Sequence, residues 1–80
     1  MKISAIKNLV ENQTLESLME AEEALLEENQ LPIEIEGDDE GEKLTHIFAA
    51  IWILKKMKDD DLEFKVALRE YTKKVRESIN

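Results

Sequence analysis

The sequence contains no cysteine, which excludes a disulfide, a thiolate nucleophile and a cysteine-ligated metal site. Residues 1–7 include two lysines and lack the long apolar run of a secretory signal peptide. Cytoplasmic proteins keep their thiols reduced and rarely depend on disulfides. We therefore expect a cytoplasmic protein.

Glycine is also scarce, with Gly37 and Gly41 as its two copies. Phosphate-binding loops and dinucleotide fingerprints need several glycines at fixed spacing, and no such pattern is present. The longest apolar run covers eight residues, 47–54, whereas a membrane-spanning helix needs about twenty. The sequence thus argues against a membrane span and gives little support to enzymatic function.

Positive charge is in short supply, since 11 lysines and arginines face 19 aspartates and glutamates for a net charge of −8. This balance argues against general attraction to DNA, RNA or anionic lipid, which are bound by lysine and arginine. Residues 1–42 carry two lysines against thirteen acids, a sum of −11, and residues 43–80 carry nine basic residues against six acids, a sum of +3. Such opposed halves could hold one chain together, join two chains, or leave each half for a different partner.

The chain does contain enough apolar side chains for one small core. Leucine, isoleucine, valine and phenylalanine supply 23 of the 80 residues, above the roughly 20% below which a charged chain stays unfolded. A chain of 80 residues has room for a single core. We expect one domain over residues 1–80.

Apolar spacings of three and four residues predict two helices in the N-terminal part. The first is short and closes at residues 11–13, with an apolar face of Ile3, Ile6, Leu9 and Val10. The second begins at Thr14, whose hydroxyl can accept a backbone N–H, and runs to about Asn29. Its apolar face holds Leu15, Leu18, Met19, Leu25 and Leu26. Its acidic face, expected to be solvated or to dock on a basic surface, holds Glu16, Glu20, Glu23 and Glu27.

Residues 31–36 alternate apolar and polar side chains, and Pro32 opposes a helix, so this short segment should be extended. Gly37 ends it. One interpretation is a strand that pairs with a second copy across a two-fold axis. The interpretation we favour is a linker that lays Ile33 and Ile35 on the core.

A third helix should begin at Asp38 or Asp39, because Asp39 and Glu42 have the spacing of a capping box. It should continue to about Lys58. Its central run, residues 47–54, is apolar on all sides, so we expect a central helix that is covered nearly all round.

A fourth helix should begin near Asp60, which repeats the capping-box spacing with Glu63, and reach about Ser78. Its apolar stripe would comprise Phe64, Ala67, Leu68, Tyr71, Val75 and Ile79. With a short connection, the third and fourth helices should form a long antiparallel helical hairpin. The predicted fold is therefore all-α, a small bundle of about four helices in which two short or medium N-terminal helices precede this hairpin.

We expect four elements to be too few to cover the third helix and the wide stripe of the fourth, which also includes Leu62 and Val66. Large exposed apolar patches are uncommon on monomers. A self-complementary homodimer is the simplest way to bury the surplus.

His46 is the single histidine, the residue type that most often acts as a general acid or base. Glu42 precedes it by four residues, one helical turn, so its carboxylate could orient or charge the imidazole. One alternative is therefore an enzyme or metal-binding protein centred on Glu42 and His46. The interpretation we favour is a helix-surface hydrogen bond or ion pair near the edge of the core.

Residues 36–42 are dense in carboxylates, the ligands that calcium prefers. An EF-hand loop with Gly41 at position six would place Ile47 at position twelve, where a bidentate carboxylate is required. A di-iron bundle needs two Glu-x-x-His pairs, and a single histidine cannot supply them. We expect no metal and no cofactor.

One side of the fourth helix carries a basic stripe at spacings of four, four and three residues, formed by Lys65, Arg69, Lys73 and Arg76. Three aspartates precede this helix and glutamates recur beside the stripe every seven residues, which argues against nucleic acid. An acidic protein surface, including the acidic helix of the same or a second chain, suits the stripe better. We predict that it docks a protein partner.

Residues 41–54, with 24–28 before them and 69–79 after them, resemble a family of short bacterial proteins of unknown function. The likeness spans nearly the whole chain, and it carries no functional residues over. Genes of such proteins often lie near thioredoxin or peroxiredoxin genes, so the resemblance implies a role around a thiol redox enzyme. Without cysteine, the chain could serve such an enzyme only as a binding partner.

These features favour protein–protein contact over catalysis. We expect a non-catalytic interaction or regulatory module that acts as a homodimer, with the acidic second helix and the basic stripe as docking faces.

Overall fold

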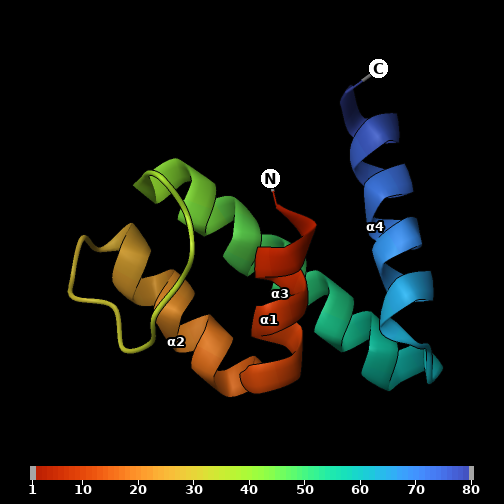
Figure 1. Ribbon diagram of the computed structural model, residues 1–80, viewed down its shortest axis with the longest axis horizontal. Helices are drawn as coiled ribbons and strands as arrows, with labels where there is room; N and C mark the ends of the chain where they lie inside the picture. Colours follow the sequence, from red (N-terminus) through yellow and green to blue (C-terminus); the bar gives the residue numbers. More distant parts are fainter. Residues whose placement is uncertain (1, 80) are drawn as a thin grey trace.

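The computed structural model describes residues 2–79, with side chains described for residues 2–77. It contains helices α1 (Ile3–Asn12), α2 (Leu15–Leu26), α3 (Glu40–Asp60) and α4 (Phe64–Ile79), arranged as Figure 1 shows, and no strand within the described residues. The predicted all-α bundle of four helices is confirmed. Across the described part, no helix is long and apolar enough to cross a membrane.

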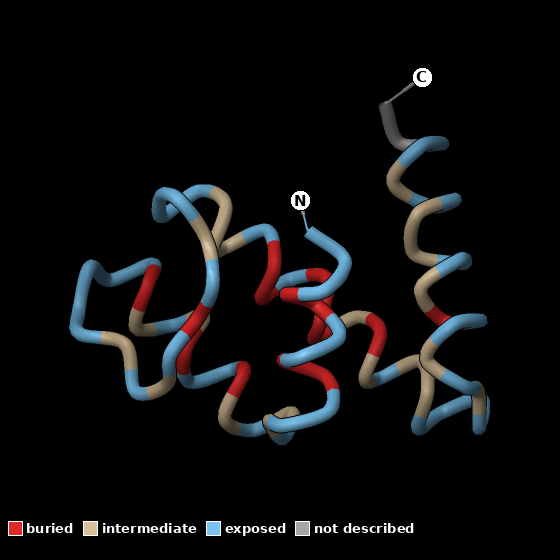
Figure 2. The backbone as a smooth tube through the Cα atoms, viewed as in Figure 1, coloured by how far each residue is buried: buried red, intermediate tan, exposed pale blue. Residues whose placement is uncertain are grey.

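The α3 helix is the centre of the bundle, because α1, α2 and α4 each pack against it. Its run of apolar residues supplies Ile47, Ala49, Ala50 and Ile53, all of which are fully buried. Figure 2 shows the buried positions concentrated where α1, α2 and α3 meet, whereas α4 is mostly exposed or half-buried. The prediction of a central α3 is confirmed, but Phe48 on the same helix stays 44% exposed.

Thr14 starts α2 as predicted, through a reciprocal capping box with Ser17. The Ser17 N–H donates to the Thr14 hydroxyl at 3.1 Å, and the Thr14 N–H donates to the Ser17 hydroxyl at 3.0 Å. The helix ends three residues before the predicted Asn29, because Glu28 turns left-handed with φ of 60°. This turn lets the Asn29 N–H donate to the Ala24 carbonyl at 2.8 Å, which closes the helix.

The segment between α2 and α3 is the linker that we favoured from the sequence. Ile35 is buried in the core, and Leu31 and Ile33 pack half-buried against it. No strand forms in the segment, so a dimer strand at 31–36 is not needed to cover these side chains. At Gly37 the linker passes so close to α3 that a Cβ atom there would lie 2.8 Å from Cγ of Lys43.

The α3 helix starts at the predicted cap, where the Asp39 carboxylate accepts the Glu42 N–H at 2.7 Å. It runs further than predicted, through Asp60, whose carboxylate pairs with the Lys56 ammonium at 2.7 Å. The predicted start of the fourth helix at Asp60 is therefore wrong. The chain turns instead at Asp61, which is left-handed with φ of 53°, and α4 begins at Phe64.

The α3 and α4 helices pack against one another through aromatic side chains. The rings of Trp52 and Tyr71 lie 5.6 Å apart between centroids and are tilted by 54°. Ala67 is the buried residue of α4, while Phe64, Leu68 and Tyr71 are half-buried, and the Ile79 side chain lies outside the described residues. Figure 1 shows α4 leaning away from α3 and standing apart from α1 and α2, so the hairpin is splayed.

Candidate interaction surfaces

His46 lies inside the protein, with no exposed surface, rather than on the helix surface that we expected. Its Nδ1 atom lies 2.7 Å from the backbone carbonyl oxygen of Glu36, and its Nε2 atom accepts the backbone N–H of Lys2 at 3.0 Å. Because Nε2 accepts, a neutral ring carries its proton on Nδ1, which donates to Glu36. The imidazole thus joins α3 to the linker and to the start of the chain.

Glu42 is the second member of the predicted polar pair, and it lies at the edge of this arrangement. Its Oε1 atom is 3.9 Å from Nε2 of His46, beyond hydrogen-bond distance. Both ring nitrogens of His46 are already occupied by backbone groups. The ring is therefore not available to a substrate or metal in this conformation. Its role in the structure is to bind two backbone groups.

The carboxylates of residues 36–42 do not converge on one point. Within the described residues, no group of three or more histidine, cysteine, aspartate or glutamate side chains is placed to hold a metal ion. Asp39 is occupied as the cap of α3. The acidic cluster therefore serves the start of a helix, where negative charge is stabilising.

The basic stripe of Lys65, Arg69, Lys73 and Arg76 is fully on the surface, and all four side chains are exposed. They lie opposite the buried side of α4, where Ala67 and Tyr71 face α3. Val66 lies on the same side as the stripe and is 41% exposed. The stripe is thus a cationic face with an apolar residue near its beginning.

Two acidic residues of α4 lie between the basic stripe and α3. Glu70 and Glu77 line a shallow depression with Trp52 and Lys56 of α3 and with Lys73 and Lys74 of α4, so Lys73 stands at the edge of the stripe nearest to them. The pKa of the Lys56 ammonium is raised, chiefly by its hydrogen bond to Asp60 and also by the nearby Glu70. The negative charge of α4 is thus partly balanced within the chain, whereas none of the four stripe side chains forms an ion pair within residues 2–77.

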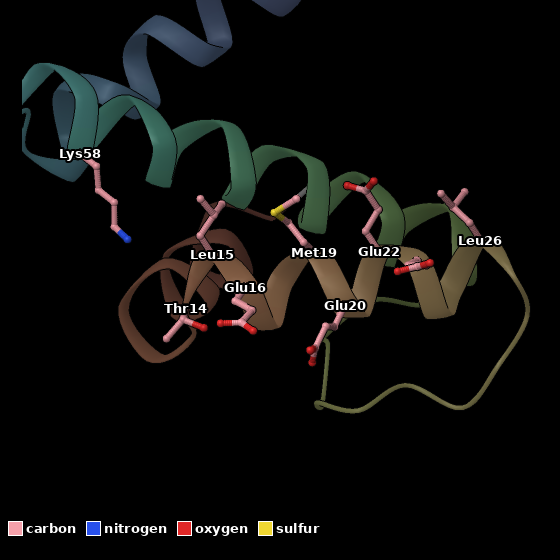
Figure 3. A pocket seen from close by; sticks show the side chains of 9 residues that line it. Thr14, Leu15, Glu16, Met19, Glu20, Glu22, Leu26 and Lys58 are labelled. Carbon is pink, nitrogen blue, oxygen red and sulfur yellow. The ribbon is translucent and has the colours of Figure 1, made fainter.

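An open groove of about 700 Å³ runs along α2 and reaches Lys58 of α3. We call it the α2 groove. Its apolar wall is formed by Leu15, Met19 and Leu26 with the half-buried Glu22 beside them, its acidic edge by Glu16, Glu20 and Glu23, and its end by Thr14 and Lys58. In Figure 3 the apolar wall lies on the α3 side of α2, while Glu16 and Glu20 point away from α3.

The groove exists because α2 has two apolar stripes, of which α3 covers one. Leu18, Ala21 and Leu25 are buried against the core. Met19 is 50% exposed and Leu26 is 59% exposed, so their predicted place in the core face is wrong. The sequence held the signal: Leu15, Met19, Glu22 and Leu26 recur at four, three and four residues, a second face beside that of Leu18 and Leu25. Glu22, which is half-buried, belongs to this second face, and we did not predict its place there.

These observations define a small all-helical protein with an acidic apolar groove and a separate basic face. A profile of the family of unknown function DUF6952 matches residues 1–80, so the chain belongs to this family. The resemblance seen in the sequence is thereby confirmed at the level of a family of unknown function. Searches of curated proteins and of solved structures found no match.

Proposed function

We propose that this protein is a non-catalytic interaction or regulatory module that works by protein–protein contact as a homodimer. The observation that carries the proposal is the unpartnered basic stripe on α4, a helix that packs on α3 and has no comparable contact with α1 or α2 within the described residues. The cytoplasmic location expected from the sequence is part of this proposal and rests on composition alone.

The charge of the stripe supports contact with an acidic protein surface. Four exposed cations on one helix face repel one another, and a partner carrying carboxylates relieves that repulsion. The chain itself offers such a surface, since its net charge is −8 and the exposed residues Glu16, Glu20 and Glu23 of α2 are followed by the exposed Glu27 at its end. A second copy is therefore a partner of suitable chemistry.

The rival function, an enzyme or metal protein centred on Glu42 and His46, has no specific observation in its favour. The imidazole is buried and engaged at both nitrogens. The thiol redox enzyme implied by the resemblance also lacks a matching feature among the described residues, and it stays a prediction.

Co-expression of a tagged and an untagged copy tests the proposal. We expect the tagged copy to capture the untagged one, and the double variant Arg69→Glu/Lys73→Glu, present in both copies, to lose most of this capture. The matched control is Lys7→Glu/Lys55→Glu, which reverses two exposed lysines away from the stripe and should leave capture unchanged. Absence of capture by the wild type, or full capture by the stripe variant, would overturn the proposal.

A further inference from the structure

The geometry points to the α2 groove as the receptor for α4 of a second copy, so that the basic stripe of each protomer lies along the acidic edge of its partner's groove. This inference rests on the proposed homodimer and identifies the two surfaces that form it. It gives a binding role to the groove, which is open among the described residues.

The groove has the shape and polarity of a helix-binding surface. Its wall is largely apolar, with Met19 and Leu26 at least half exposed, and its edge carries the three exposed carboxylates of Glu16, Glu20 and Glu23 against the one ammonium of Lys58. Amphipathic helices bind in apolar grooves, and the charges at the rim select the partner. Methionine suits such a surface because its flexible side chain adapts to what it contacts. The occupant should therefore be a helix with an apolar residue and a basic edge.

The outer face of α4 meets this description. From Val66, the stripe residues Arg69, Lys73 and Arg76 follow at three, four and three residues, which places all four on one side of the helix. Lys65 lies at the border of the same side. With 16 residues α4 is longer than the 12-residue α2, so the two helices can lie along one another over the whole groove.

The same chain cannot supply the occupant in the observed fold. Figure 1 shows α2 and α4 at opposite ends of α3, and they share no substantial contact. A two-fold axis would let each protomer give its α4 and receive its partner's, so every contact would be made twice. Doubling matters because a single short helix pair is a small interface, whereas stable dimers bury about 800 Å² on each partner.

Charge-exchange variants test this pairing. The stripe variant is Arg69→Glu/Lys73→Glu, and the groove variant is Glu20→Lys/Glu23→Lys. All four positions are exposed, so both variants should keep the helical circular dichroism of the wild type. Each variant alone would meet like charge at both contacts of the dimer, and we expect its dimer Kd to rise at least about tenfold.

Mixing the two variants distinguishes this pairing from others. The acidic α4 of the stripe variant would meet the basic groove of the groove variant, and both wild-type surfaces would meet at the other contact. We expect a heterodimer with a Kd close to that of the wild type. A mixture of the groove variant with Lys7→Glu/Lys55→Glu is the control and should give no comparable heterodimer.

The possible outcomes separate the two proposals. A wild-type dimer that the stripe variant weakens and the groove variant does not would overturn the groove pairing and leave the proposed function standing. A wild-type dimer that neither variant weakens would overturn both. Loss of dimer in both variants without recovery in the mixture would also overturn the pairing. The stripe and the groove would then contribute to the dimer without contacting one another. A wild type that remains monomeric would overturn both.

Discussion

The backbone N–H of Lys2 donates a 3.0 Å hydrogen bond to Nε2 of His46, across 44 residues of sequence. The other ring nitrogen of His46 engages the carbonyl oxygen of Glu36 at 2.7 Å. A buried polar group is costly unless it is hydrogen-bonded, and here one side chain satisfies two backbone groups from distant segments. His46 therefore fixes the start of the chain and the linker on α3.

Replacing His46 by leucine should destabilise the fold strongly. The substitution leaves the N–H of Lys2 and the carbonyl of Glu36 without their partner, and we expect a loss of about 2–4 kcal/mol in the free energy of unfolding. Urea unfolding followed by the fluorescence of Trp52, the single tryptophan, measures this loss. The control Glu42→Gln should change stability by less than about 0.5 kcal/mol, because Glu42 lies beyond hydrogen-bond distance. Equal effects of the two substitutions would contradict the assigned role.

The substitution Glu28→Gly should stabilise the protein. Glu28 adopts a left-handed φ of 60°, which costs a non-glycine residue about 1–2 kcal/mol. Part of this gain is offset by the larger entropy of glycine in the unfolded chain, so we expect a net increase of about 0.5–1 kcal/mol for Glu28→Gly. The control Glu27→Gly removes a similar charge at a residue with φ of −90° and should give no increase. Thermal unfolding of both variants makes the comparison.

Stability should fall at alkaline pH because of Tyr71. Burial raises the pKa of its phenol above the ordinary value of 10.0. The unfolded chain then loses this proton at lower pH than the folded one. The free energy of unfolding is therefore at its full value below pH 10 and falls as the pH rises further. Asp60 raises the pKa of Lys56, so the contribution of this pair to stability is also lost at alkaline pH.

Tyr71→Phe separates the contribution of the phenol from that of Lys56. This variant should have a shallower decline of stability above pH 10 than the wild type in urea titrations. Tyr71 is the single tyrosine, so the absorbance of tyrosinate reports its ionisation directly in the folded protein. Identical alkaline profiles for the wild type and Tyr71→Phe would show that this burial has no effect.

Gly37→Ala should lower stability by about 1–2 kcal/mol. The added Cβ would lie 2.8 Å from Cγ and 3.1 Å from the backbone nitrogen of Lys43, so the linker or the start of α3 would have to shift. A double-mutant cycle with Lys43→Ala separates the two contacts, because that substitution removes Cγ and keeps the nitrogen. We expect part of the cost to persist in the Lys43→Ala background. If Gly37→Ala left the free energy of unfolding unchanged, the linker would be able to shift at this point without cost.

Helical periodicity and capping chemistry were sufficient to predict the class of fold and most helix boundaries. Thr14 and Asp39 cap their helices as predicted, because capping is a local interaction between neighbours in sequence. The two errors at helix ends arose where a residue that disfavours positive φ adopts it nonetheless, at Glu28 and Asp61. Single-residue propensities rarely assign positive φ to a residue other than glycine, so these two helix ends were not predicted.

The surfaces were less accessible to prediction than the helices. The basic stripe follows from spacing within one helix, so it could be predicted, and its four side chains are exposed. The α2 groove depends on which of two apolar faces α3 covers, and the burial of His46 depends on contacts with residues 2 and 36. These are long-range relationships, which periodicity in a single sequence does not determine.

Sedimentation equilibrium of the wild-type protein, over a range of protein concentrations and at low and high salt, tests the central claim most directly. We predict a reversible shift from one chain mass to two as concentration rises, with a weaker dimer at high salt because exposed charges are screened. A single chain mass at every concentration and salt condition would contradict the account.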